Sequence, residues 1–368
     1  MQAVKEKTAV VLPNHLGDVT MATPALRALR AGLPDSSISV VVRHELAGLL
    51  DGAPWFDRLI AHDVYGAARA AGRLRRRIAL GRALRGHDTV VVLPNSWSAG
   101  LIALASGAVR RVGYARRGRG GLLTRALPAP RDGGRFVPIA MERYYLDLVV
   151  RGLSCPDLGT ALELWSDPES EMHCDAAFAA HGIDEERSLV CLAPGAGYGP
   201  AKLWPPGYVA ELARALLDGD AQVALVHGPG EEPLADEIRA AAGPGLVSLG
   251  GEAMTLGLLK AVLARASLLV CNDAGARHVA AAFSVPALVL MGPTSIQYTN
   301  LNLKKTRLLR EPVACSPCQR KICPIDHRCM TRLLPQRVIR EARAALCDPE
   351  WRGSLDLEPA QMTSAEPA

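Results

Sequence analysis

Short runs of Val, Leu and other apolar residues alternate along the chain with longer segments that have the apolar spacing of helices. The runs lie at residues 7–13, 37–43 and 88–93 in the first half and at 188–193, 222–227, 246–249, 268–271 and 287–291 in the second. An uninterrupted β-branched run is typical of a parallel strand that is covered on both faces. Strands that alternate with helices predict an α/β fold built on doubly wound parallel sheets.

The series of strands and helices starts twice, which predicts two Rossmann-like domains. A chain of 368 residues exceeds a single core of about 150 residues. We expect an N-terminal domain at 1–184 and a C-terminal domain at 185–347, with a ligand in the cleft between them. Residues 348–368 mix Pro, Ser and acidic residues without periodicity and predict a mostly mobile tail.

Nothing in the sequence indicates a secreted or membrane-spanning protein. The N-terminal segment lacks an apolar stretch of signal-peptide length, and no run of about 18 apolar residues occurs. We therefore expect a cytoplasmic protein. In that compartment the nine cysteines are thiols or metal ligands rather than a disulfide framework.

Four cysteines are clustered, at Cys315, Cys318, Cys323 and Cys329. Their residue type and compactness suit a zinc site, but the second spacing is far shorter than that of a zinc ribbon. Packed thiols are the favoured interpretation; a structural metal or a disulfide remains the alternative.

Arginine is concentrated in one stretch of the first half. Residues 66–135 contain fifteen Arg and two acidic residues, Asp88 and Asp132, although the net charge of the whole chain is only +5. Such an asymmetry indicates an anionic partner. A solvated, Arg-rich surface is the competing interpretation, chiefly for residues 73–77.

Polar residues that directly follow a parallel strand lie where such sheets bind ligands. The first such turn is 14–18, in which Gly17 permits close approach and Asp18 stands at a helix start. Asp18 is a candidate catalytic carboxylate, and N-capping of the helix is the competing interpretation. A second turn, 227–232, carries Glu231 and Glu232, either of which could accept the hydroxyls of a ribose or cap the next helix.

The loop at 194–205 is rich in Gly and contains a single Lys, Lys202, before a helix. Backbone amides of such a loop approach phosphate oxygens closely, and an ammonium adds charge. The spacing differs from that of a Walker A motif, which argues against an ATPase. The turn at 270–278 adds Gly275 at a helix start and His278 in its first turn, so we expect both turns to bind a diphosphate. A flexible loop with a solvated Lys202, and a structural role for His278, are the competing interpretations.

In order along the chain, these segments resemble glycosyltransferase family 9, the heptosyltransferases, and most closely the heptosyltransferase II branch. The resemblance covers about residues 8–345. It rests on the segments LPNHLGDVTMATPALRAL, VLPNSWSAGLIA, RRVGYARRGRGGLLT, AMERYYLDL, PGAGYGPAKLWPPGYVAEL, NDAGARHVAAAFSVPALVLMGPTS and ACSPCQRKICPIDHRCM.

The resemblance implies a GT-B fold and an inverting, metal-independent transfer of heptose from ADP-L-glycero-D-manno-heptose to the lipopolysaccharide inner core, heptosyl-Kdo2-lipid A. It implies no cofactor and no nucleic-acid partner. Contact with the inner membrane face would be peripheral. The only Asp-x-Asp triplet of the kind that binds a metal, at 218–220, predicts a turn.

By the same resemblance, Asp18 is the catalytic base and Lys202 stabilises the leaving diphosphate. The donor-binding residues are Gly195, Gly199, Lys202, Glu231, Asp273, Ala274, Gly275 and His278. The acceptor-binding residues are Asn14, Asn95, Ser96, Arg110, Arg111, Arg116 and Arg117. Ala274 stands where the family usually has Ser or Thr, and Gly197 replaces a common acidic residue.

Other classes stay open on the sequence. One is a different GT-B enzyme, either another nucleotide-sugar transferase or a sugar-nucleotide epimerase. The other is a non-catalytic nucleotide-sugar-binding protein. The exact sugar, the acceptor hydroxyl and the oligomeric state are not fixed by these residues.

Overall fold

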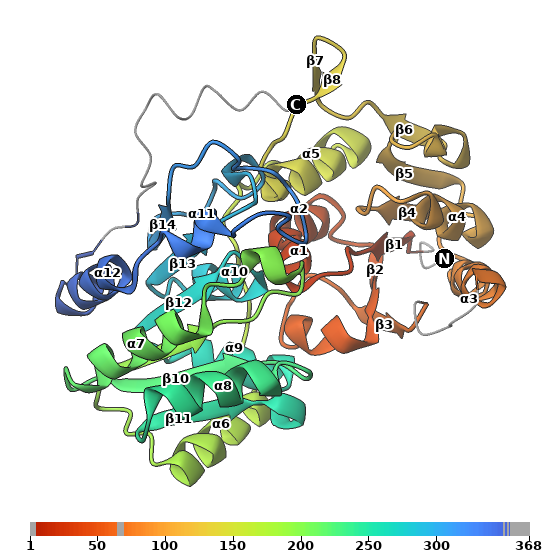
Figure 1. Cartoon of the computed structure of the whole chain (residues 1–368). Helices are drawn as coiled ribbons and strands as arrows, with labels where there is room; N and C mark the ends of the chain where they lie inside the picture. The colour runs from red at the N-terminus through yellow and green to blue at the C-terminus, as the bar shows by residue number, and fades with distance from the viewer. Residues whose placement is uncertain (1–4, 65–69, 349, 352, 354–368) are drawn as a thin grey trace. The chain divides into compact units, whose positions relative to one another are not determined.

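The computed structural model describes residues 5–64, 70–348, 350, 351 and 353. The chain divides into two compact units. The first comprises residues 1–163 and 297–301, and the second comprises 164–296 and 302–368. Each unit is an α/β structure around one six-stranded parallel sheet, as the alternation of strands and helices predicts (Figure 1).

The sheet of the first unit has the strand order β3-β2-β1-β4-β5-β6, and all its neighbouring strands are parallel. This is the order of a Rossmann fold, in which the chain reverses direction across the sheet between the first and fourth strands. The strands are β1 (Lys7–Val11), β2 (Ser37–Arg43), β3 (Arg58–His62), β4 (Thr89–Val92), β5 (Arg110–Tyr114) and β6 (Arg125–Leu127).

Helices pack in pairs in the first unit, α2 with α5 and α3 with α4 (Figure 1). They bury the apolar residues of β1, β2 and β4 almost completely, which explains the continuous β-branched runs. The helices are α1 (Leu16–Met21), α2 (Thr23–Gly32), α3 (Ala70–Ala83), α4 (Trp97–Ser106) and α5 (Met141–Leu153), with 3-10 turns η1 (His44–Leu50) and η2 (Arg119–Leu122) and an antiparallel hairpin of β7 (Arg131–Asp132) and β8 (Arg135–Phe136).

The second unit repeats the topology. Its strand order is β11-β10-β9-β12-β13-β14, again parallel throughout. The strands are β9 (Leu189–Ala193), β10 (Gln222–His227), β11 (Leu246–Gly250), β12 (Leu268–Asn272), β13 (Ala287–Met291) and β14 (Thr306–Arg310).

In the second unit α7 packs against α8 and α12, and α6 packs against α9 (Figure 1). The core on one face of this sheet centres on the fully buried Trp204, whose indole N–H donates to the carbonyl oxygen of Leu333 at 2.8 Å. The elements are α6 (Pro168–His181), α7 (Pro206–Leu217), α8 (Glu232–Ala242), α9 (Leu256–Ala264), α10 (Gly275–Ala282), α11 (Arg328–Thr331) and α12 (Pro335–Cys347), with 3-10 turns η3 (Pro200–Lys202), η4 (Gly251–Ala253) and η5 (Ile296–Tyr298).

The change of unit comes at Glu163, earlier in the chain than the boundary expected at residue 184. Helix α6 accounts for the difference, because it packs against α9 of the second unit. Most of the tail predicted at 348–368 lies outside the described residues. Within it Trp351 is buried in the core of the second unit, and the Arg307 guanidinium lies 5.1 Å from its ring centre.

Candidate functional site

The candidate site residues lie at the carboxyl ends of the strands in each unit, where parallel sheets bind ligands. In the first unit the relevant turns follow β1, β4 and β5, which are neighbours in the sheet. In the second unit they follow β9, β10, β12 and β13, also neighbours. Each unit therefore gathers its own set of polar side chains.

Asp18 lies in the first turn of α1, directly after β1. The N-cap of this helix is His15, so Asp18 does not hold the capping position that the sequence left as its alternative role. Its carboxylate lies 3.4 Å from His15 Nδ1, and Tyr145 on α5 lies near enough for the Asp18 charge to act on its hydroxyl. Burial first, and the Asp18 charge second, raise the pKa of Tyr145 well above its usual value, so this hydroxyl is a neutral donor.

The turn after β4 supplies Asn95 and Ser96. Ser96 is the N-cap of α4, and its hydroxyl accepts from the Ala99 amide at 3.2 Å. The Asn95 side-chain oxygen accepts from the hydroxyl of Tyr144 at 2.9 Å. Ser96 therefore stabilises the start of α4, whereas Asn95 belongs to a polar group that includes Tyr144.

Two arginines after β5 join this group. Arg119 is fully buried, and its guanidinium donates to the carbonyl oxygens of Pro94, Ser96 and Tyr114. Its Nη2 and the Nε of Arg116 are buried without a hydrogen-bond partner in the described part of the chain. Burial lowers the pKa of Arg119 to about 10, so this guanidinium is charged at neutral pH. The sequence reasoning missed Arg119, although it lies in the segment RRVGYARRGRGG.

The other predicted acceptor residues are placed differently. Arg110 and Arg111 lie at the amino end of β5, opposite the edge that carries Asn95. Arg110 pairs with Glu6, and Arg111 donates to the carbonyl oxygens of Leu122 and Ala108. The structure therefore does not bring these two arginines together with Arg116. Arg117 is exposed, and Asn14 is half-buried after β1 with its carbonyl oxygen accepting from Arg43.

In the second unit Lys202 and Asp273 come together. The ammonium of Lys202, in the turn η3 after β9, lies 2.7 Å from the Asp273 carboxylate and 2.6 Å from the Asp273 carbonyl oxygen after β12. The same carboxylate accepts from Thr294 at 2.6 Å and from Arg277 at 3.1 Å. All four residues are at most 9% exposed.

This group carries two cations and one anion. Burial alone would raise the pKa of Asp273, but the charges of Arg277 and Lys202 hold it well below its usual value. Burial, with the Arg277 charge, lowers the pKa of His278 to about 3, so this imidazole is neutral at physiological pH. The site therefore keeps a net positive charge at the end of the Gly-rich loop.

The Gly-rich loop is held to the neighbouring strand ends. Asn272 at the end of β12 donates to the Pro194 carbonyl oxygen and accepts from the Trp204 amide at 3.2 Å, so one side chain fixes both ends of the loop. A Cβ at Gly195 would lie 1.9 Å from the Glu231 carboxylate, which explains why Gly stands there. Glu231 also accepts from the Gly228 amide at 3.0 Å.

The turn after β12 continues into α10. Ala274 is the N-cap and makes no side-chain hydrogen bond there, and Gly275 is the first helical residue. The first amides of this helix are therefore directed at the same strand edge as the Gly-rich loop. Predicted donor residues Gly195, Glu231, Asp273, Gly275 and His278 thus lie on adjoining turns of one unit.

None of the four clustered cysteines forms a disulfide; Cys329 is buried and Cys315 and Cys318 are exposed. Burial and the neighbouring thiols raise the pKa of Cys329 to about 11. Across the residues that the structure describes, no group of three or more His, Cys, Asp or Glu side chains is placed to hold a metal ion. Nor does any described helix have the length and apolar character needed to span a membrane.

Two Rossmann-ordered sheets in one chain, with a buried lysine at the Gly-rich loop of the second, define an α/β protein of the GT-B class of glycosyltransferases. The family model of glycosyltransferase family 9 (heptosyltransferase) matches residues 77–328. The chain is 30% identical to lipopolysaccharide heptosyltransferase 2 of Escherichia coli K12 over 94% of its own length and 99% of that protein.

Solved structures agree with this match. The ADP-heptose lipopolysaccharide heptosyltransferase II of E. coli superposes with a TM-score of 0.76 at 28% identity, covering 94% of this chain and 100% of the other. A family 9 glycosyltransferase from Veillonella parvula has the same fold, with a TM-score of 0.80 at 21% identity, covering 94% and 99%. The chain belongs to glycosyltransferase family 9, the heptosyltransferases.

Proposed function

We propose that this protein transfers heptose from ADP-heptose to the inner core of lipopolysaccharide, with inversion and without a metal ion. The observation that carries the proposal is the buried group of Lys202, Arg277 and Asp273 at the Gly-rich loop, whose net charge is positive. The similarity to lipopolysaccharide heptosyltransferase 2 over nearly the whole of both chains supports the donor and the acceptor.

The second unit binds the donor. Amides of the Gly-rich loop and of the α10 N-terminus donate to the diphosphate. The ammonium of Lys202 lies beside them and supplies the positive charge that a metal ion supplies in other glycosyltransferases. Glu231, held against Gly195, accepts the ribose hydroxyls. His278 is neutral and donates one N–H to a phosphate oxygen.

Asp18 acts as the general base. As the acceptor oxygen forms a bond to the anomeric carbon, the bond from that carbon to the phosphate oxygen breaks, and its electron pair leaves with ADP. Asp18 takes the hydroxyl proton. Tyr145 places a neutral hydroxyl close to the Asp18 carboxylate and helps to position it. Displacement in one step inverts the anomeric centre without a covalent intermediate.

The first unit binds the acceptor through Arg116, and the fully buried Arg119 holds the turn after β4 beside it by its bonds to the Pro94 and Ser96 carbonyl oxygens. Arg116 is half-buried and its Nε has no hydrogen-bond partner in the described chain, and guanidinium groups bind carboxylates and phosphates in two-point fashion. Asn95 and Tyr144 add neutral hydrogen-bonding groups beside them. Arg110 and Arg111 are left out of this proposal because their guanidiniums are occupied at the other strand edge.

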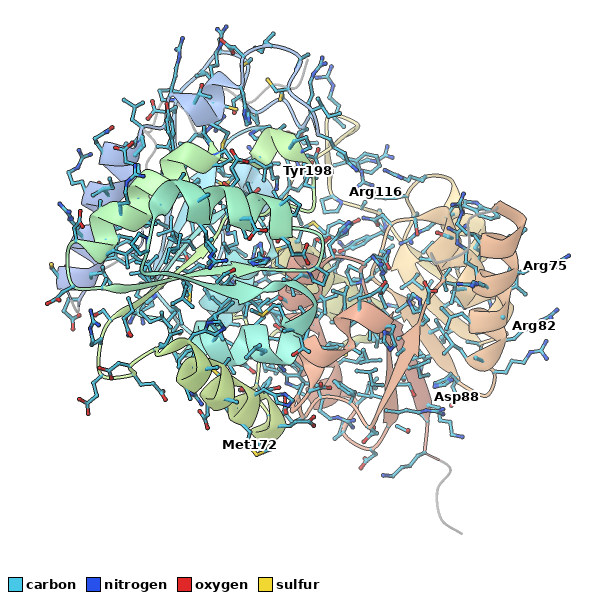
Figure 2. The ribbon with its side chains drawn as sticks, turned by 60° about the horizontal axis from the view of Figure 1, so that its bottom comes forward. Arg75, Arg82, Asp88, Arg116, Met172 and Tyr198 are labelled. Atoms are coloured by element: carbon cyan, nitrogen blue, oxygen red, sulfur yellow. The ribbon has the colours of Figure 1, made fainter. Side chains whose placement is uncertain are left out.

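Helix α3 supplies a surface for peripheral contact with the anionic membrane leaflet. It contains no acidic residue, and Arg75 and Arg82 extend outward from it (Figure 2). Basic residues near such a leaflet contribute about 1 kcal/mol each. We expect the double variant Arg75→Glu/Arg82→Glu to lose binding to anionic vesicles; unchanged co-sedimentation contradicts this part of the proposal.

Product analysis tests the activity. Mass spectrometry should detect heptose added to a heptosyl-Kdo2-lipid A acceptor with ADP-heptose and not with UDP-sugars, and the transfer should persist in EDTA. Asp18→Asn should lower kcat by about 10²–10⁴-fold while ADP binding is preserved. Asp35→Asn, an exposed carboxylate of the same unit, is the matched control. Transfer by Asp18→Asn at the rate of the control would remove Asp18 from this role.

Two arginine variants test the acceptor assignment. Arg116→Met should lower kcat/KM for the acceptor by about tenfold and leave the KM for the donor unchanged. Arg110→Met serves as the control, because Arg110 pairs with Glu6. Equal effects of the two substitutions would count against an anion site at Arg116.

A further inference from the structure

Residues 315–329, named here the cysteine loop, are docked against the Gly-rich loop within the second unit. The Ala201 amide donates to the Lys321 carbonyl oxygen at 3.0 Å, and the Tyr198 hydroxyl donates to the Gln319 carbonyl oxygen at 2.5 Å. His327 Nε2 lies 2.7 Å from the Ala201 carbonyl oxygen. Two segments more than a hundred residues apart therefore form one structure around Tyr198.

The cysteine loop is also fixed to the end of β13. The Gln319 amide donates to the Pro293 carbonyl oxygen at 2.8 Å, and the Ser316 hydroxyl donates to the Gly292 carbonyl oxygen at 2.6 Å. Thr294, which donates to Asp273, follows these two residues directly. The loop is thus anchored at the strand edge that carries the donor-binding turns.

Lys321 is held especially close to the Gly-rich loop. A Cβ at Gly199 would lie 2.6 Å from the Lys321 carbonyl oxygen, and Gly199 has a φ of +151°, which favours glycine. Contact with the backbone of Lys321 therefore explains the Gly at position 199. The same contact fixes the backbone position from which the Lys321 side chain extends.

The Lys321 ammonium lies over the ring of Tyr198, 5.7 Å from its centre, and the Lys202 ammonium lies 5.0 Å from the same centre (Figure 2 labels Tyr198). Lys202 is bonded to the Asp273 carboxylate. Lys321 is exposed and pairs with no carboxylate of the described residues. The Gly-rich loop thus has a second ammonium beside it whose charge nothing in the described chain compensates.

We propose that Lys321 is a donor-binding residue that pairs with the diphosphate of the nucleotide sugar, alongside Lys202. This inference rests on the proposed function, because it assumes a nucleoside diphosphate at the Gly-rich loop. The negative charge of a diphosphate is larger than the net positive charge of the buried group of Lys202, Arg277 and Asp273. An ammonium that reaches it from solvent adds charge without the desolvation penalty that a third buried cation would incur.

Binding of ADP, AMP and adenosine, measured by calorimetry at one ionic strength, tests the inference. Lys321→Met should weaken ADP binding by about tenfold and leave adenosine binding unchanged, because only the phosphates meet the ammonium. The matched control is Arg320→Met, which removes a positive charge from the neighbouring exposed position. Wild-type ADP affinity in Lys321→Met, or the same loss in both variants, overturns the inference.

The folded state of the variants is checked by their melting temperatures, which should equal that of the wild type because the Lys321 hydrogen bond uses its backbone oxygen. If the wild-type protein itself fails to bind ADP, the donor assignment and this inference fall together. If the wild type binds ADP and Lys202→Ala weakens it while Lys321→Met does not, only the inference about Lys321 is wrong.

Discussion

The ammonium of Lys202 lies 2.7 Å from the carboxylate of Asp273, and both groups are buried. The two residues follow neighbouring strands, β9 and β12. Their contact therefore joins two opposite charges and also two of the turns that we propose to bind the donor. Asp273 also accepts from Arg277, so one carboxylate separates two buried cations.

Replacing Asp273 by Asn should destabilise the protein strongly. Lys202 and Arg277 would keep their positive charges without the carboxylate between them, and removing one partner of a buried ion pair costs about 3–5 kcal/mol. We expect urea denaturation at pH 7 to show a loss of that size. Lys202→Met, which leaves Asp273 paired with Arg277, should cost less, and equal losses would contradict the shared-carboxylate arrangement.

Gly195→Ala should weaken ADP binding by about tenfold or more, because the added Cβ would lie within 2 Å of the Glu231 carboxylate and displace it. Gly197→Ala in the same loop is the control, since a Cβ there meets nothing within 4 Å. Calorimetric titration with ADP distinguishes the two. A similar affinity for both variants would mean that the position of Glu231 does not matter for the nucleotide.

The neutral, buried His278 should make the protein less stable in mild acid. Its pKa is about 3 in the folded protein and about 6.5 when unfolded, so the unfolded chain takes up a proton that the folded one does not. The contribution is complete above pH 6.5 and is lost as the pH falls toward 3. Between pH 7 and pH 5 this residue alone should lower the free energy of unfolding by about 2 kcal/mol.

Urea denaturation of His278→Gln at the two pH values measures this difference. The variant should lose about 2 kcal/mol less than the wild type between pH 7 and pH 5. His181→Gln changes an exposed histidine of α6 and should keep the wild-type pH dependence. Parallel curves for wild type and His278→Gln would show that His278 is not held neutral.

Tyr145→Phe should lower kcat by about tenfold and leave both KM values near those of the wild type, because it removes the neutral hydroxyl that lies close to the Asp18 carboxylate. Steady-state kinetics with both substrates measures kcat and the two KM values separately. Tyr208→Phe also loses a hydroxyl that donates to a carbonyl oxygen, at Thr331, and is the control for stability. A loss of kcat in both variants would indicate general destabilisation rather than positioning of Asp18.

The alternation of strands and helices was sufficient to predict both parallel sheets, since a continuous β-branched run reflects burial on two faces. Edge strands such as β3 and β14 carry charged residues among their apolar ones and gave no such signal. The boundary expected at 184 rested on where the strand pattern restarts. The pattern could not show that α6 packs against α9 of the second unit.

Turn residues of the candidate site could be predicted because polar residues that directly follow parallel strands lie at the sheet edge where such folds bind ligands. The partners of those residues could not. Tyr145 and Arg119 look like an ordinary helical aromatic and an ordinary surface cation in the sequence, and only the folding of distant segments buries them beside Asp18 and Asn95. Lys321 likewise reaches the Gly-rich loop through a contact that spans more than a hundred residues.

The two hydrogen bonds of Asn272 hold the Gly-rich loop at both of its ends before any nucleotide arrives. Little conformational entropy remains to be lost there when a ligand binds, so the binding free energy reflects how well the ligand fits. A nucleotide whose phosphates are spaced differently would meet amides that cannot adjust to it. Selectivity for the diphosphate would then come from the rigidity of the Gly-rich loop. Asn272 maintains that rigidity and need not contact the substrate.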